Sequence, residues 1–96
     1  MPTIVYSARA LTDLDRLVDF LAQEDPALAH VALERIAEAI RMLDRHPYIG
    51  RLVRGGLREL VISRGRTGYV ALYRVVPSDD LVEILAVRHQ PEAGYA

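Results

Sequence analysis

Two amphipathic helical segments meet at an Asp25-Pro26 step, and this feature most constrains how the chain can fold. From Ala8 to about Gln23, apolar residues recur at steps of three and four with charged residues between them, which is typical of a surface helix. Asp25 suits a helix N-cap and Pro26 suits the first helical position, so a second helix begins there. The short connection predicts an antiparallel helical hairpin in which each helix has one apolar stripe to bury.

The second helix is expected to run to about Arg45, because Pro47 disfavours helical backbone in His46. The stripe of the first helix is expected to comprise Leu11, Leu14, Leu17, Val18 and Leu21, and that of the second Ala29, Leu33, Ile36, Ile40 and Leu43. The side chains expected to pack on the rest of the fold are Leu14, Leu17, Leu33, Ile36, Ile40 and Leu43.

The apolar surface for the hairpin to cover comes from segments rich in β-branched and aromatic residues. One precedes the helices, at Thr3–Tyr6, and is followed by Ser7, a good N-cap. Three more follow the helices, at Leu57–Ser63, Tyr69–Val76 and Leu81–Val87. The expected order is β-α-α-β-β-β, an α+β fold in which a helical hairpin packs on a small, mainly antiparallel, twisted sheet. The length of 96 residues fits a single domain over residues 1–96.

The turns and faces of the sheet can also be predicted. Glycine- and proline-containing breaks at residues 64–68 and 77–80 predict two hairpin turns, and the glycine-rich stretch 47–56 predicts a shaped loop. The two-residue period of a strand places Val82, Ile84 and Ala86 on one face, and Glu83, Leu85 and Val87 on the other.

Composition excludes several kinds of chemistry. The chain has no cysteine and no lysine, which excludes disulfides, thiolate catalysis and lysine chemistry. The three histidines lie far apart in sequence, so we expect no metal centre and no cofactor. No apolar run reaches the length of a membrane span and the first residues do not resemble a secretory signal, so we expect a cytoplasmic protein with no membrane partner.

Charge is unevenly distributed along a chain whose net charge is only -1. Residues 1–50 carry five arginines and eight acids, whereas residues 51–74 carry six arginines and one acid, Glu59. A nearly neutral protein can therefore present a basic surface to an acidic partner.

Several short motifs occur in a fixed order along the chain: Ala10-Leu-Thr-Asp-Leu-Asp15, His46-Pro47, Gly50-Arg51, Leu57-Arg58-Glu59-Leu60, Tyr73-Arg74-Val75 and Val87-Arg88-His89-Gln90. Together with the order of elements, they resemble the ParE branch of the RelE/ParE superfamily, the toxins of bacterial type II toxin-antitoxin modules. The resemblance implies a small α+β toxin that a cognate ParD-like antitoxin neutralises in a hetero-oligomeric complex. It also implies one of two targets, since ParE-like members act on DNA gyrase and RelE-like members cut mRNA in the ribosome.

Two activities and an inactive form follow from this resemblance. A metal-free ribonuclease needs a general base, a general acid and cations around the phosphorane. The residues that could supply these groups are His89, Glu59 and Tyr95 for proton transfer, and Arg58, Arg74 and Arg88 for charge. RelE-like nucleases tend to be strongly basic and lysine-rich, unlike this chain, so we favour gyrase poisoning over RNA cleavage. An inactive homologue that only binds an antitoxin is the third alternative.

The residues expected to contact the antitoxin or the target are Arg51, Arg54, Arg58, Arg74, Arg88 and His89. Structural roles compete with this interpretation at two of them. His89 ends an apolar strand, where a histidine usually bonds to a nearby carbonyl group. Arg74 interrupts an apolar strand, and if it is buried it needs a partner such as Glu59 or Glu83.

Overall fold

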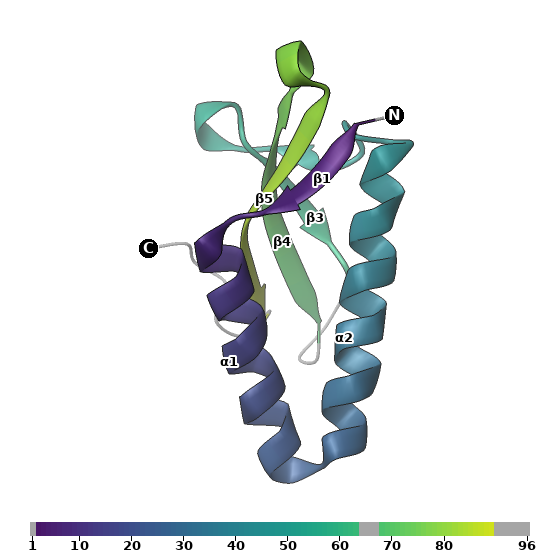
Figure 1. The fold of residues 1–96 in the computed structure, drawn as a ribbon, viewed down its shortest axis with the longest axis vertical. Coiled ribbons are helices and arrows are strands. Elements are labelled where there is room, and N and C mark those ends of the chain that lie inside the picture. The colour runs from purple at the N-terminus through teal and green to yellow at the C-terminus, as the bar shows by residue number, and fades with distance from the viewer. Residues whose placement is uncertain (1, 64–67, 90–96) are drawn as a thin grey trace.

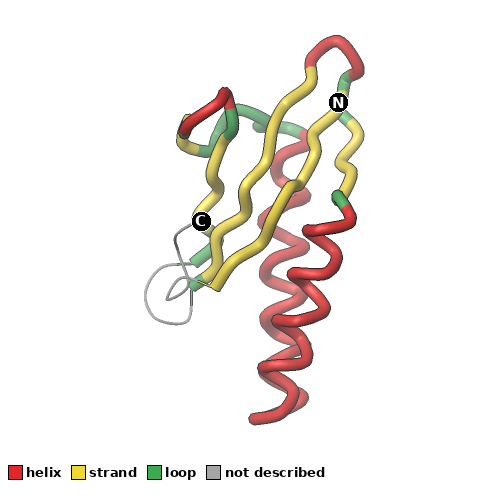
Figure 2. The backbone as a smooth tube through the Cα atoms, turned by 90° about the vertical axis from the view of Figure 1, so that its left-hand side faces the viewer, coloured by secondary structure: helices red, strands yellow, loops and turns green. Residues whose placement is uncertain are grey.

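A computed structural model describes residues 2–63 and 68–89 of the chain. A helical hairpin lies against one face of a five-stranded sheet, so the fold has two layers (Figures 1 and 2). The elements are β1 (Thr3–Tyr6), α1 (Ala8–Glu24), α2 (Pro26–Arg41), β2 (Arg51–Leu52), β3 (Arg58–Val61), β4 (Tyr69–Val76) and β5 (Leu81–His89). The strand order is β1-β5-β4-β3-β2, with β1 parallel to β5 and all other pairs antiparallel. The expected α+β architecture is therefore confirmed.

The helices begin where the capping residues predict. The Ser7 hydroxyl accepts a hydrogen bond from the Ala10 amide at 3.0 Å, and the Asp25 carboxylate accepts one from the Ala27 amide at 3.0 Å. The second helix ends at Arg41 rather than near Arg45, and a 3₁₀ turn follows it. This turn uses the amides of the next residues to satisfy carbonyl groups that the helix end would leave free.

The core lies between the hairpin and the sheet, but its helical stripe differs from the expected one. Ile36, Ile40 and Leu43 are fully buried as expected, and Leu14 and Leu17 pack against the core. Leu33 and Leu11, in contrast, are exposed, and the neighbouring Ala32 and Ala10 are buried in their place. Most of each expected stripe is therefore present, and in each helix one leucine gives way to the alanine that precedes it.

The tip of the hairpin extends beyond the end of the sheet (Figure 2). Phe20 and Leu28, close to the tip, are exposed although both are large apolar residues. The sheet is shorter than the helices and cannot cover them. Among the described residues, no helix is both long enough and apolar enough to cross a membrane.

A bulge in β5 places some side chains on the other face of the sheet from the one predicted. Leu72 pairs with Ala86 and Tyr73 pairs with Ile84, so one residue of β5, Leu85, has no partner on β4. An extra residue of this kind reverses the alternation of side chains beyond it. Val82 and Ile84 share a face as predicted, and it is the face that packs on the helices, but beyond the bulge Val87 joins them in the core in place of Ala86.

The connection between the helical hairpin and β3 also differs from the prediction. The stretch 47–56, expected to be only a loop, contains β2, which pairs with β3 through Arg51 and Glu59. Two residues of strand are too short to give a periodic signal in the sequence. The predicted turn at residues 77–80 is present, whereas residues 64–67 of the other turn lie outside the described part.

Three partly or fully buried tyrosines predict a loss of stability in alkali. Burial raises the pKa of Tyr6, Tyr69 and Tyr73 above the ordinary value of 10.0. The folded state therefore favours the neutral phenol. Its contribution to stability is complete below pH 10 and is lost as the pH rises through the higher pKa of the folded state.

We expect the urea midpoint, followed by circular dichroism, to fall above about pH 10. The Tyr73→Phe variant removes one of the three ionising groups, and its midpoint should fall less steeply over the same range. A midpoint that stays constant between about pH 9 and 11 would contradict this expectation.

Candidate functional site

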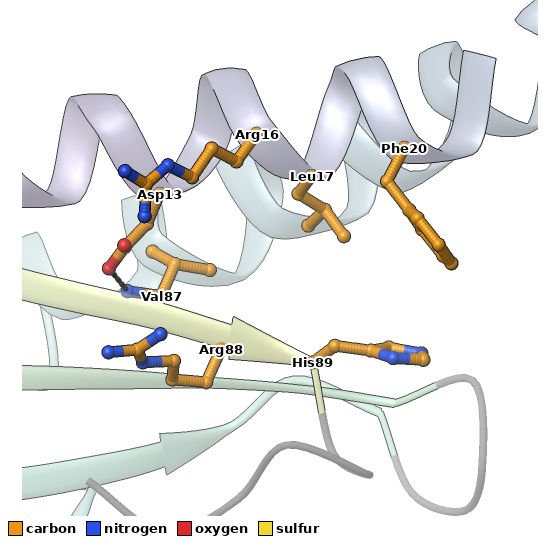
Figure 3. Close-up of a pocket in the computed structure, with 7 residues that line it drawn as sticks. All are labelled: Asp13, Arg16, Leu17, Phe20, Val87, Arg88 and His89. Carbon is orange, nitrogen blue, oxygen red and sulfur yellow. Dashed lines mark hydrogen bonds between the residues drawn. The ribbon is translucent and has the colours of Figure 1, made fainter. Parts of the chain in front are cut away.

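A cavity of about 420 Å³ lies between α1 and the end of β5 (Figure 3). The side chains around it include a carboxylate, the guanidinium group of Arg16, an imidazole and three apolar groups. The lining residues are Asp13, Arg16, Leu17, Phe20, Val87, Arg88 and His89. The cavity thus places an apolar part of α1 with flanking charge beside Arg88 and His89, two of the residues expected from sequence to bind a partner.

Asp13 lies in one wall of this pocket. Its carboxylate accepts a hydrogen bond from the edge of β5, as a neighbouring strand would. β1 pairs with β5 only as far as Ile84, because the chain turns into α1 at Ser7. Beyond that point the edge of β5 needs other partners. The Ser7 hydroxyl donates to the Leu85 carbonyl at 3.1 Å, and the buried Asp13 carboxylate accepts from the Val87 amide at 3.0 Å. These contacts fix β5 against α1 and set the position of the residues that follow.

His89 and Arg88 leave β5 on opposite sides. His89 pairs with Tyr69 of β4, and the two rings pack with centroids 5.5 Å apart and planes tilted by 41°. Arg88 lies on the other side of the strand from Val87 (Figure 3). Within the described part of the chain, the buried Nε of Arg88 has no hydrogen-bond partner. A buried donor of this kind is normally satisfied, so it is suited to an acceptor brought by a bound partner.

A second group of functional candidates lies around the loop that precedes β2. The Arg58 guanidinium donates to the carbonyl groups of Tyr48 at 3.2 Å and Gly50 at 2.9 Å, and it lies 5.0 Å from the centre of the Tyr48 ring. The Tyr73 hydroxyl accepts from the Gly50 amide at 2.8 Å and donates to the Pro47 carbonyl at 2.8 Å. Arg58 therefore holds the loop in place through one of its terminal guanidinium nitrogens.

The remaining predicted arginines lie on the face of the sheet away from the helices or near its edge. Arg51 binds Glu59 at 2.7 Å, and Arg74 binds Glu83 at 2.8 Å. The expected partnership of Arg74 with Glu83 is thus present, but Arg74 is exposed rather than buried. Exposed pairs of this kind contribute only about 0–1 kcal/mol, so both arginines can exchange their partner for an acidic group on another protein.

The residues proposed for a nuclease centre are not brought together. His89 lies over the helix-covered face with Tyr69, whereas Glu59 and Arg74 lie on the opposite face, each in an ion pair. Arg58 is engaged by the loop carbonyls. Tyr95 lies outside the described residues.

Several residues of both sites were not predictable from the sequence. Asp13, Arg16 and Phe20 looked like ordinary residues of an amphipathic helix, and Tyr48 and Tyr73 looked like a loop residue and a strand residue. None of them gave a separate signal in the sequence, because the burial of Asp13 depends on how α1 is rotated against the sheet. Over residues 2–63 and 68–89, no three His, Asp or Glu side chains are grouped as metal ligands would be.

Comparison with known proteins agrees with this fold. Residues 4–94 match the model of the ParE toxin of the type II toxin-antitoxin system parDE. Two Caulobacter vibrioides proteins are similar over nearly their whole length. Toxin RelE3 is 36% identical over 96% of this chain and 98% of its own, and Toxin RelE2 is 37% identical over 93% and 96%.

Solved structures share this fold. A chain of the chromosomal ParDE system from P. aeruginosa superposes with a TM-score of 0.75 and 25% identity, over 93% of this chain and 96% of that one. A chain of the E. coli RelBE toxin-antitoxin complex shares the fold, with a TM-score of 0.59 and 16% identity over 93% and 96%. The chain therefore belongs to the ParE toxin family, within the ParE/RelE superfamily of type II toxin-antitoxin toxins.

Proposed function

We propose that this toxin acts in the bacterial cytoplasm by binding DNA gyrase and stabilising its cleavage complex with DNA, and that a cognate ParD-like antitoxin neutralises it. The family match and the ParDE structure support this proposal. The names of the C. vibrioides relatives point instead to RelE. The choice between a gyrase poison and a ribosome-dependent ribonuclease therefore rests on the chemistry of the site.

The separation of the candidate nuclease groups is the observation that carries the proposal. Cleavage of RNA without a metal requires a base, an acid and cations around one phosphate group. In this protein His89 is on one face of the sheet, and Arg74 and Glu59 are on the other. A phosphate cannot contact both faces at once. Binding to a protein target makes no such demand, because contact residues can be spread over a surface.

The pocket between α1 and β5 is the best candidate for antitoxin binding. It offers apolar contacts from Leu17 and Phe20 beside the cation of Arg16. An antitoxin segment with an acidic residue among apolar ones would satisfy both features, and its association should be slower at high salt.

Two parallel assays test the target. Purified toxin is incubated with gyrase and supercoiled plasmid, and separately with ribosomes and mRNA. We expect linear plasmid after detergent and protease treatment, and no ribosome-dependent cuts in the mRNA. The His89→Ala variant should retain this activity as far as it remains folded, whereas loss of a general base would reduce the rate on the order of 100-fold or more.

The other outcomes identify the alternatives. Ribosome-dependent cuts that disappear in His89→Ala, together with no linear plasmid, would establish the ribonuclease. An antitoxin complex without either activity would identify an inactive homologue.

A further inference from the structure

Three large apolar side chains are exposed within five residues of the loop and strand that follow the helical hairpin. Tyr48, Ile49 and Leu52 are 55%, 54% and 61% exposed. Single exposed apolar residues are common, but a group of this size on a small protein marks an interaction surface. Arg51 and Arg54 are exposed at its border. These five residues are called the loop platform below.

The loop platform is rigid although it is exposed. The backbone of the loop that carries it is hydrogen-bonded to side chains of the sheet. The Tyr73 hydroxyl bonds to Pro47 and Gly50, and the Arg58 guanidinium bonds to Tyr48 and Gly50. The Ile49 amide also donates to the His46 carbonyl at 3.1 Å. A surface held in this way loses little conformational entropy on binding.

Arg58 also brings the parts of the loop platform together. Leu52 is its partner in the register of β2 and β3, and the Tyr48 ring lies 5.0 Å from its guanidinium carbon. The two apolar side chains therefore flank the same arginine. Tyrosine and arginine are the residue types that most often dominate the binding energy of protein interfaces.

We propose that the loop platform is the surface with which the toxin contacts its target protein, at an apolar depression bordered by carboxylates. This inference rests on the proposed action on gyrase and specifies which part of the toxin is involved. Protruding, fixed apolar side chains fit a pocket in a folded partner, whereas a flexible antitoxin segment fits the pocket between α1 and β5. Arg54, together with Arg51 when it exchanges Glu59 for a carboxylate of the partner, favours an acidic partner surface.

A nucleic acid is a poorer match for the same surface. Phosphate groups would meet Arg51 and Arg54, but the backbone of DNA or RNA offers no apolar surface for Ile49 and Leu52. These two side chains would stay in water on binding. Substituting them therefore separates contact with protein from contact with phosphate.

The test uses the full chain with the double substitution Ile49→Ser and Leu52→Ser. Both residues are exposed, so the variant should keep the melting temperature and circular dichroism spectrum of the wild type. We expect the linear plasmid formed with gyrase to decrease by about 10-fold or more, as for residues central to an interface. Antitoxin binding, measured by calorimetry, should stay within about twofold of the wild type.

A matched control carries Leu28→Ser and Val31→Ser on α2, where the side chains are 47% and 44% exposed and lie away from the loop platform. This control should form as much linear plasmid as the wild type. A folded loop-platform variant that retains wild-type cleavage would overturn the inference and leave the action on gyrase intact. Equal loss of antitoxin binding would assign the surface to the antitoxin instead. A wild-type toxin that yields no linear plasmid would overturn the action on gyrase, and this assignment with it.

Discussion

The Ile36→Ala variant is expected to lose about 2–5 kcal/mol of unfolding free energy. Ile36 is only 1% exposed, on the face of α2 that packs into the core with Tyr73 and Ile84. Truncation removes buried methyl and methylene groups and leaves a cavity that a close-packed core fills only in part. Urea denaturation followed by circular dichroism measures the change.

Leu33→Ala is the matched control, because it removes a similar volume from the same helix at a site that is 41% exposed. Its cost should be well below that of Ile36→Ala, in the range of about 0.5–1 kcal/mol. This comparison also tests the corrected stripe of α2. Similar losses in the two variants would mean that Leu33 is in the core, as its position in the sequence pattern predicts.

The elements of the fold were predictable because their signals are local. Ser7 and Asp25 cap helices through their own side chains, and Pro26 can occupy only a first turn. Which of Leu33 and Ala32 is buried could not be predicted from the local sequence, since both continue the same helical repeat. It depends on how the helix is rotated against the sheet, which the pattern in one helix does not specify.

The bulge in β5 limited prediction of the sheet in the same way. Alternation gave the correct face for Val82 and Ile84, but a single extra residue reversed it for Ala86 and Val87. The bulge is fixed by contacts with Ser7 and Asp13, which are more than seventy residues away in sequence.

The candidate site was predicted less completely than the fold. Arg88 and His89 do line the pocket, yet its opposite wall comes from α1, whose residues carry no separate signal. Arg58 belongs to the basic stretch as expected, but the structure uses it to hold the loop. A count of charges shows where a basic surface can form, and the hydrogen bonds decide which cations remain available to a partner.

Gly50→Ala is expected to destabilise the protein by about 1–3 kcal/mol, because it forces an extra carbon into a filled space. A Cβ at this position would lie 2.6 Å from the hydroxyl oxygen and 2.7 Å from Cε1 of Tyr73, both far inside normal contact distance. The same hydroxyl group holds the amide of Gly50 and the carbonyl of Pro47. The ring is fully buried and cannot turn aside without breaking these bonds.

A double-mutant cycle with Tyr73→Phe isolates this contact. Removing the hydroxyl group abolishes the shortest clash as well as both hydrogen bonds, so Gly50→Ala should cost less when it is combined with Tyr73→Phe than when it is introduced alone. The difference should be about 1 kcal/mol, measured by urea denaturation of the four proteins. Additive losses would show that Gly50 and Tyr73 are not coupled. In that case the position of the loop would be attributed to Arg58 and to the hydrogen bond between Ile49 and His46, and not to the tyrosine.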